Sequence, residues 1–112
     1  MAMMKKALVI ENDQPTQLEI ILTSHQSDGV YRYQPEPEDT AKLIIYNDEN
    51  INIKEFDVDM TDPKYLFVNI DTTGIPEGKY KFRVEAYLAS EAATYIVKEN
   101  EPVLIRRLKE NA

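Results

Sequence analysis

The sequence predicts an all-β domain, folded as an antiparallel β-sandwich of about seven or eight short strands. The strongest evidence is the stretch from Ile75 to Leu88, where side chains alternate between apolar and polar after a turn at Pro76 and Gly78. Alternation with a period of two is typical of a strand that buries one face and exposes the other. Further short apolar segments recur between turn-forming residues, and the only helix candidate, 90–93, is too short to be stable alone. A small barrel is the alternative way to close such a sheet.

The segment after this turn is long enough to form a strand in the interior of the sheet. One of its faces is apolar and predicted to be buried, and it carries Tyr80, Phe82, Val84, Ala86 and Leu88. The opposite face is predicted to be exposed, and it carries Lys79, Lys81, Arg83, Glu85 and Tyr87. The rest of the sheet is expected to assemble around this strand.

Two strands are predicted in the first part of the chain. The first is short, 7–10, and ends in a turn-rich cluster at 11–15. The second follows from the alternation of Leu18, Ile20 and Leu22 with polar neighbours. Its Leu18 face is predicted to point inward.

The segment 24–39 is predicted to be the main loop of the domain. It is polar and contains Pro35 and Pro37, and proline removes backbone donors that a sheet needs. Only brief pairing is expected inside it, around 30–33. Long loops in compact domains often carry function, so this loop is a candidate for partner binding.

The middle of the chain predicts a hairpin. Residues 43–46 form a continuous apolar run that is typical of an interior strand. Residues 47–50 favour a turn, after which Ile51 and Ile53 resume the alternation. The acidic segment 57–63 ends at a proline and is interpreted as an irregular crossing.

The same signals predict the remaining strands. Segments 65–70, 94–98 and 103–107 alternate or are rich in β-branched residues, and 100–102 is predicted to be a turn between the last two. The tail 108–112 is expected to be frayed.

Length and composition predict a single domain over residues 1–112, with its core at about 7–107. A chain of 112 residues, 43% of them hydrophobic, can form a core without covalent crosslinks. The sequence has no cysteine, which excludes disulfides and thiolate metal sites. This composition fits a protein of the cytosol, or of a particle that assembles in the cytosol.

Charge and hydropathy exclude further classes. The net charge of −7, from 20 acidic and 13 basic residues, disfavours nucleic-acid binding because an acidic surface repels phosphate backbones. The apolar run after Lys5 and Lys6 is shorter than the roughly 7–15 residues of a signal peptide. No apolar run approaches the ~20 residues of a membrane span. We therefore expect no signal peptide and no membrane partner.

No residue pattern predicts catalysis, a cofactor or a metal centre. His25 lies beside Ser24 and close to Asp28, but no Gly-x-Ser-x-Gly sequence presents a nucleophile, so it is interpreted as a loop histidine. The acidic segment 57–62 could offer oxygen ligands to a weak calcium site, yet it lacks the EF-hand spacing. Paired carboxylates for glycoside hydrolysis would need a larger cleft than so small a chain offers. The chain is predicted not to be an enzyme.

The tyrosines leave two kinds of contact open. Tyr31, Tyr33 and Tyr87 are predicted to be exposed, and the first two share one face of a short segment. This arrangement suits a contact patch for a protein partner. A sugar is the alternative ligand, because exposed aromatic rings also form platforms for carbohydrate.

The pattern Ile75-Pro76-x-x-x-Tyr80-x-Phe82-x-Val84 resembles the corner between strands E and F of fibronectin type III and immunoglobulin-like domains. The resemblance implies an immunoglobulin-like β-sandwich. It also implies that Pro76 and Tyr80 form a tyrosine corner, in which the Tyr80 hydroxyl bonds to backbone a few residues upstream.

Three further segments resemble small β-sandwich proteins of tailed bacteriophages, including the N-terminal domains of baseplate upper proteins and related head or tail components. These segments are Glu11-Asn12-Asp13 before an alternating strand, Asp39-Thr40-Ala41 before an apolar strand, and Asp71-Thr72 followed by Pro76-Glu77-Gly78-Lys79-Tyr80. The resemblance spans about residues 10 to 88.

The bacteriophage resemblance implies a virion structural protein without catalysis, found in the virion or in the host cytoplasm before assembly. Its partners would be protein subunits of the particle, with a homo-oligomer as one option. Docking through a sheet edge or through the 24–39 loop is the expected mechanism. Two alternatives remain open: an immunoglobulin-like module that binds carbohydrate or a cell-surface partner, and a small hydrolase that uses the acidic loops.

Overall fold

The computed structural model describes residues 7–11, 16–20, 23–26, 29–32, 35–62 and 65–107. These residues form strands and turns without a helix, which confirms the all-β prediction. The nine strands are β1 (Leu8–Glu11), β2 (Thr16–Ile20), β3 (Thr23–Gln26), β4 (Gly29–Arg32), β5 (Thr40–Tyr46), β6 (Asn52–Asp59), β7 (Leu66–Ile70), β8 (Gly78–Leu88) and β9 (Ala93–Arg106).

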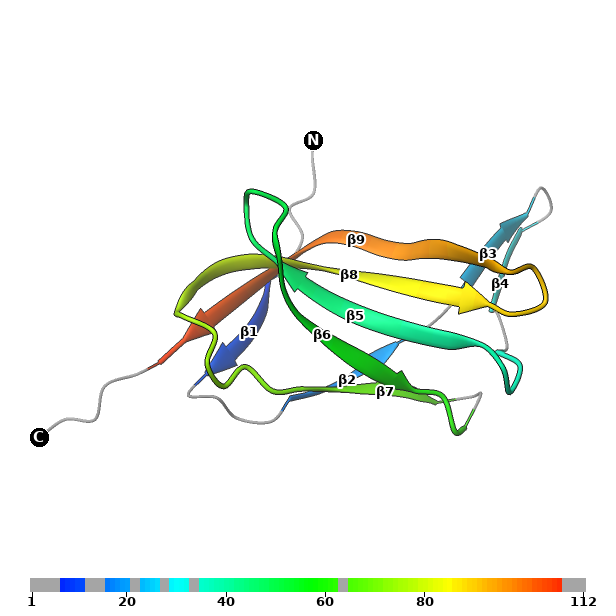
Figure 1. The fold of residues 1–112 in the computed structure, drawn as a ribbon, viewed down its shortest axis with the longest axis horizontal. Helices are drawn as coiled ribbons and strands as arrows, with labels where there is room; N and C mark the ends of the chain where they lie inside the picture. Colours follow the sequence, from blue (N-terminus) through cyan, green and yellow to red (C-terminus); the bar gives the residue numbers. More distant parts are fainter. Residues whose placement is uncertain are drawn as a thin grey trace, which may run out of the picture.

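Seven of the strands form one sheet, in the order β1-β9-β8-β5-β6-β7-β2, and β3 and β4 form a separate hairpin (Figure 1). Neighbouring strands are antiparallel, except that β1 runs parallel to β9, with Ile10 opposite Ile105. The prediction of a purely antiparallel sheet is therefore wrong at β1. No short turn joins β1 to β9, so their relative direction is not set by a hairpin.

The sheet bends at β6 because that strand changes partner along its length. Its first part pairs with β5 up to Asp57, whereas Val58 and Asp59 pair with β7. The bend curls the sheet nearly into a barrel, with β1 and β2 at its two ends (Figure 1). The shape thus lies between the predicted sandwich and the barrel considered as its alternative.

The concave side of this curl encloses the core. Its members are Ile10, Ile20, Ala41, Leu43, Ile45, Val58, Leu66, Val68, Ile70, Ile75, Phe82, Val84, Ala86, Val103 and Ile105. The alternation predicted for β8 is confirmed at Phe82, Val84 and Ala86, and β8 is an interior strand between β9 and β5.

The continuous apolar run of β5 is explained by burial on both faces. Leu43 and Ile45 belong to the core, while Ile44 and Tyr46 are buried on the outer face. The guanidinium of Arg83 lies 5.2 Å from the centre of the Tyr46 ring and helps to cover it. The predicted β5–β6 hairpin is confirmed, but Ile51 and Ile53 are exposed near its turn.

The predicted turn at 100–102 is wrong, because β9 is one strand of 14 residues. Asn100 adopts a left-handed backbone with φ of 56°, and β9 shifts its register twice against β8 in this region. The Asn100 amide donates to the Tyr46 hydroxyl at 3.0 Å, and that hydroxyl donates to Asn100 Oδ1 at 3.0 Å. The extra residues are absorbed as bulges, a setting in which Pro102 is tolerated.

Part of the predicted 24–39 loop is a hairpin, since β3 pairs with β4 from Thr23 opposite Arg32 to Gln26 opposite Gly29. The segment that follows is fixed by Asp39, whose side chain is only 5% exposed. Asp39 Oδ2 accepts the Glu36 amide at 2.9 Å, and Oδ1 accepts the Ala89 amide at 3.0 Å. One carboxylate therefore ties the start of β5 to the β8–β9 turn. The tail 108–112 lies outside the described residues.

Replacing Asp39 with Ala should lower the free energy of unfolding by about 1–3 kcal/mol, because two backbone donors lose their acceptor. Asp48→Ala is the control, since Asp48 is exposed in the β5–β6 turn. Urea denaturation of both variants measures the difference. Equal stability of the two variants would contradict a stabilising role for the Asp39 hydrogen bonds.

The Tyr80 hydroxyl donates to the Pro76 carbonyl oxygen at 2.7 Å. Gly78 lies between the two residues with φ of 153°, a backbone conformation that side chains disfavour. A Cβ atom at Gly78 would lie 3.7 Å from the Tyr80 ring, so the ring packs directly over this turn. The hydrogen bond therefore closes the loop that leads into β8.

Tyr80→Phe should cost about 0.5–1.5 kcal/mol of stability because it removes this one hydrogen bond and keeps the ring. Tyr65→Phe is the matched control, because Tyr65 is 53% exposed. Thermal unfolding compares the two variants. If the two variants unfold at the same temperature, the Tyr80 hydroxyl adds no stability and only the packing of its ring contributes.

Candidate docking surface

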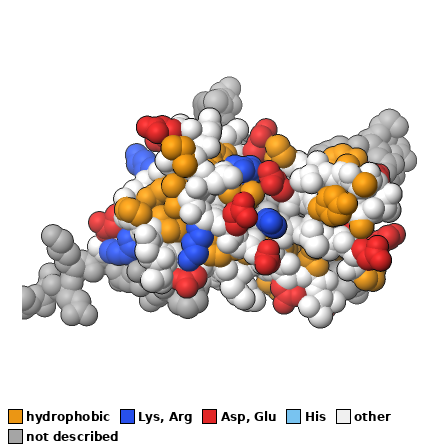
Figure 2. Space-filling model, in the orientation of Figure 1, with side chains coloured by type: hydrophobic (Ala, Val, Ile, Leu, Met, Phe, Trp, Pro, Cys, Tyr) orange, Lys and Arg blue, Asp and Glu red, His pale blue; other side chains and the backbone are white. Residues whose placement is uncertain are grey.

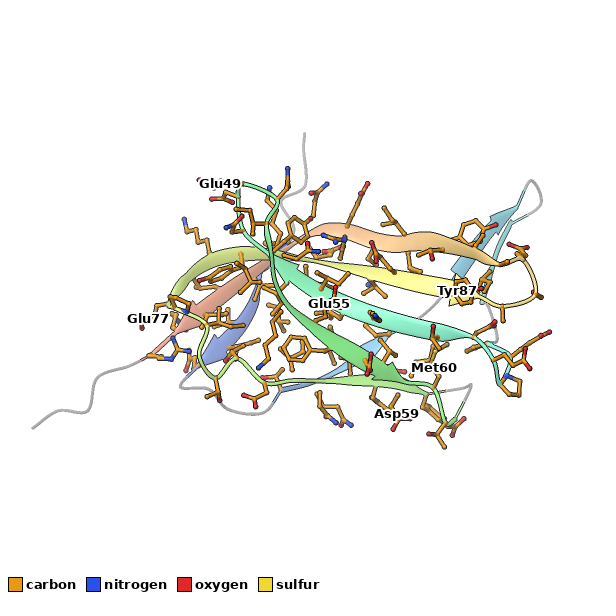
Figure 3. The ribbon with its side chains drawn as sticks, viewed as in Figure 1. Glu49, Glu55, Asp59, Met60, Glu77 and Tyr87 are labelled. Atoms are coloured by element: carbon orange, nitrogen blue, oxygen red, sulfur yellow. The ribbon has the colours of Figure 1, made fainter. Side chains whose placement is uncertain are left out.

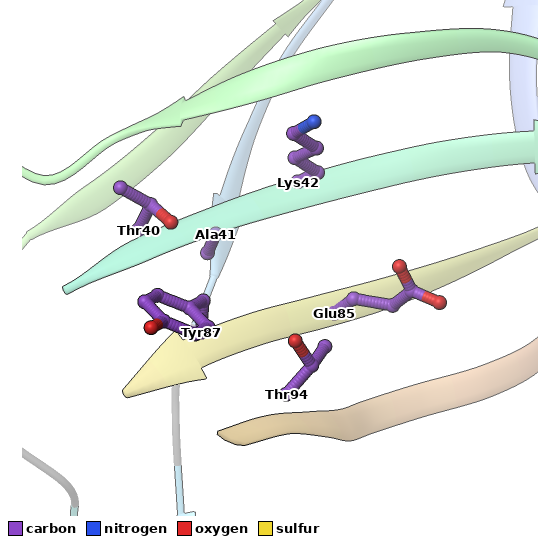
Figure 4. Close-up of a pocket in the computed structure, with 6 residues that line it drawn as sticks. All are labelled: Thr40, Ala41, Lys42, Glu85, Tyr87 and Thr94. Atoms are coloured by element: carbon purple, nitrogen blue, oxygen red, sulfur yellow. The ribbon is translucent and has the colours of Figure 1, made fainter. Parts of the chain in front are cut away.

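The candidate site lies on the outer face of the sheet, where β5, β8 and β9 run side by side. Strand register forms two rows there: Thr40, Tyr87 and Thr94 in one, and Lys42, Glu85 and Ile96 in the other. We call these six residues the Tyr87 surface. With Ala41, all but Ile96 line a hollow of about 260 Å³ (Figure 4).

Two apolar side chains of the Tyr87 surface are exposed. Tyr87 is 41% exposed at the end of β8 (Figure 3), and Ile96, on β9, is 57% exposed. Neither is required in the core, so their burial against a partner would gain free energy without rearranging the fold. Aromatic and aliphatic residues of this kind form the centres of protein interfaces.

The charges beside Tyr87 are balanced and held in place. Lys42 Nζ lies 3.8 Å from a carboxylate oxygen of Glu55, and Arg83 Nε lies 3.1 Å from one of Glu85. Arg83 also stacks on the buried Tyr46 ring, so its position is fixed from below. Basic and acidic side chains are interspersed on this face (Figure 2). The surface is therefore close to neutral on a protein whose net charge is −7.

An unpaired strand edge borders the Tyr87 surface. β8 covers one side of β9, and β1 covers the other side only from Val103 to Arg106. Within the parts of the chain that the structure describes, no strand pairs with the outer side of Ala93–Lys98. Backbone donors and acceptors on such an edge are available to another strand.

Tyr95 lies on the opposite face from Tyr87, in register with Ala86, and is 48% exposed. Its hydroxyl donates to a carboxylate oxygen of Glu91. This hydrogen bond, together with the negative charge of Glu91, raises the pKa of Tyr95. The contact anchors Tyr95 to the β8–β9 turn at the start of the edge.

Of the three tyrosines predicted to contact a partner, Tyr87 lies on the candidate surface. The backbone of Tyr31 is in β4 opposite Ser24, and Tyr33 lies outside the described residues. His25 is opposite Val30 in the β3–β4 hairpin, and Asp28 lies outside the described residues.

Two acidic residues stabilise turns, and one of them, Asp59, lies in the segment 57–62 that was considered for calcium. Asp59, at the end of β6 (Figure 3), accepts the Thr61 amide at 3.0 Å, and hydrogen bonds from Thr61 lower the pKa of Asp59. Asp71 accepts the hydroxyl and the amide of Thr73 at 2.7 and 3.0 Å, which likewise lowers its pKa. Over the described ranges, no group of three or more His, Asp or Glu side chains could hold a metal ion.

The unpaired edge and Ile96 were missed by the sequence-based prediction. A signal for them exists, because Thr94-Tyr95-Ile96-Val97 is an uncharged run of strong β-formers. The run itself does not tell which side of the strand is covered.

No model of a protein family matches the chain, and a search of curated proteins finds no significant match. Among the described residues, the structure contains no helix long and apolar enough to cross a membrane.

Proposed function

We propose that this protein is a non-enzymatic structural component of a bacteriophage particle, in the head, connector, tail or baseplate. It acts by docking to protein subunits of that particle. The observation that carries the docking role is the Tyr87 surface, where exposed apolar side chains lie beside balanced charges and an unpaired strand edge. The bacteriophage assignment comes from the sequence resemblance.

The proposal includes an immunoglobulin-like sandwich as the finer description of the fold. Two hydrogen-bonded layers that share β6 support it, β1-β9-β8-β5-β6 on one side and β6-β7-β2 on the other. The hydrogen bond from Tyr80 to the Pro76 carbonyl is further support, because a tyrosine corner contains such a bond.

The docking role fits the distribution of energy in protein interfaces. A few aromatic or aliphatic anchors supply most of the affinity, and a polar rim excludes water from them. Tyr87 and Ile96 are suited to be anchors, while Lys42 and Glu85 are suited to form part of the rim. Acidic and basic groups of the rim would select the partner by charge complementarity.

Tyr87→Ala should weaken binding to the particle about 30-fold, the equivalent of roughly 2 kcal/mol for one anchor. The measurement is binding of purified protein to particles assembled from a phage genome that lacks this gene. Tyr65→Ala is the control, because Tyr65 is equally aromatic and 53% exposed but lies off the Tyr87 surface. Equal binding by both variants would contradict the assignment of the surface.

A second candidate function, carbohydrate binding, is favoured by the polar lining of the hollow. Two threonine hydroxyls, one ammonium and one carboxylate line the hollow together with the Tyr87 ring, and they belong to Thr40, Thr94, Lys42 and Glu85 (Figure 4). Such groups can hydrogen-bond the hydroxyls of a single sugar ring placed on the tyrosine.

A glycan array separates the two functions with the same two variants. The carbohydrate function predicts array binding by the native chain that Tyr87→Ala abolishes and Tyr65→Ala keeps. The docking function predicts no array binding by the native chain, and particle binding that depends on Tyr87.

A further inference from the structure

Among the residues that the structure describes, Asp39 is the one charged residue that is buried, with 5% of it exposed. A buried charge costs free energy unless hydrogen bonds offset its loss of water. Asp39 Oδ2 accepts the Glu36 amide at 2.9 Å, and Oδ1 accepts the Ala89 amide at 3.0 Å. Hydrogen bonds to a carboxylate are stronger than those to a neutral acceptor. The carboxylate therefore holds both its own turn and a backbone segment that is distant in the sequence.

The turn that contains Asp39 orients its carboxylate. The Asp39 amide donates to the Glu36 carbonyl oxygen at 3.0 Å, and the Glu36 amide donates back to Asp39 Oδ2. Because these hydrogen bonds run in opposite directions, they fix the side chain relative to its own backbone. Asp39 Oδ1 therefore meets the Ala89 amide with little further loss of side-chain freedom.

The hydrogen bond to Ala89 lies where the pairing between β5 and β8 ends. Thr40 opposite Tyr87 is the last pair of these two strands, so β5 offers no further pair to the residues that follow Tyr87. The Asp39 side chain supplies an acceptor there and keeps the end of β8 against the start of β5. Without this bond, the pair of Thr40 and Tyr87 would be the fraying end of the ladder.

The same bond reaches the β9 side of Tyr87 through the β8–β9 turn. The Ala92 amide donates to the Ala89 carbonyl oxygen at 3.2 Å, and Ala92 has a left-handed backbone with φ of 49°. The turn therefore begins at the residue that Asp39 holds. Immediately after the turn, Thr94 pairs with Tyr87. One carboxylate thus acts on the backbone at both neighbours of Tyr87 in its row.

We infer that Asp39 is the positioning residue of the Tyr87 surface. It is buried and does not itself contact a partner, but it holds Tyr87 in the row with Thr40 and Thr94 that lines the hollow (Figure 4). An anchor that is ordered before binding loses less entropy on binding, so the complex is tighter. The inference rests on the proposed docking function and adds a residue that controls it from below the surface.

Hydrogen exchange of the purified chain tests the local effect. Asp39→Ala should make the Ala89 amide exchange at least about tenfold faster, because that amide loses its charged acceptor. Tyr80→Phe is the control, since it removes a hydrogen bond at the opposite end of β8 and should leave the Ala89 rate unchanged. Equal acceleration of Ala89 exchange in both variants would overturn the inference.

Binding to the particle tests the effect on the Tyr87 surface. Asp39→Ala should weaken binding about two- to tenfold, the range expected when one anchor must be ordered during association. Tyr80→Phe should bind like the native chain although it also lowers stability. Both variants are compared at a temperature where circular dichroism shows that they are folded. Native affinity of folded Asp39→Ala would contradict the positioning role.

A double-mutant cycle shows whether Asp39 acts through Tyr87. In a chain that already carries Tyr87→Ala, Asp39→Ala should weaken binding further by less than about twofold, because no anchor remains to be positioned. A purely structural contribution of Asp39 would weaken binding equally in both backgrounds. Additive effects of the two substitutions would therefore overturn the inference.

Asp39→Asn is the second variant, and it keeps the volume of the side chain if Asp39→Ala does not fold. Its side-chain amide has one acceptor oxygen, so it can serve the amide of Glu36 or that of Ala89 but not both. Binding should weaken if Ala89 exchange becomes faster and stay native if Ala89 exchange stays slow. Fast Ala89 exchange with native binding, or slow exchange with weakened binding, would refute the positioning role.

The inference and the proposed function can fail separately. If Tyr87→Ala binds the particle like the native chain, the docking function fails, while fast Ala89 exchange in Asp39→Ala still supports the hold of Asp39 on the end of β8. If Tyr87→Ala weakens binding and folded Asp39→Ala does not, the docking function stands and the positioning role of Asp39 is refuted.

Discussion

The contact between Tyr46 and Asn100 decides how β9 is built, and the rest of the architecture depends on β9. The buried tyrosine hydroxyl both accepts the Asn100 amide and donates to its side chain. These bonds hold a left-handed residue inside the strand, so the extra residues bulge instead of reversing the chain. β9 can then pair with β8 over almost its whole length and with β1 at one end.

Polar side chains close the curled sheet where strand pairing stops. Lys54 Nζ donates to the Asp71 carbonyl at 2.9 Å, which bridges β6 to the segment after β7. Arg107 donates to the carbonyl of the buried Thr72 at 3.1 Å. At the opposite end of the sheet, the Asp39 carboxylate accepts the backbone amides of Glu36 and Ala89. Backbone donors and acceptors at these places lie outside the strand pairing and need other hydrogen-bond partners. Charged side chains provide them.

Several acidic residues of this chain stabilise turns. Their presence in the sequence therefore does not by itself indicate a binding or catalytic site. Asp39, Asp59 and Asp71 each accept backbone amides in turns, and the last two have lowered pKa values as a result. The Tyr87 surface is instead nearly neutral, and its exposed tyrosine and isoleucine lie near two ion pairs.

The sequence by itself determined the all-β class, the strand at 78–88 with its buried face, the β5–β6 hairpin and the exposure of Tyr87. These features follow from alternation and turn chemistry, which act over neighbouring residues. Only the tertiary structure decided that β9 continues through Asn100, that β1 lies parallel to β9, and that β3 and β4 pair inside the expected loop. It also decided that, among the described strands, none pairs with the outer side of 93–97. Such features depend on partners far apart in the chain, such as Tyr46 and Asn100, and local pattern carries no information about which distant strand lies alongside.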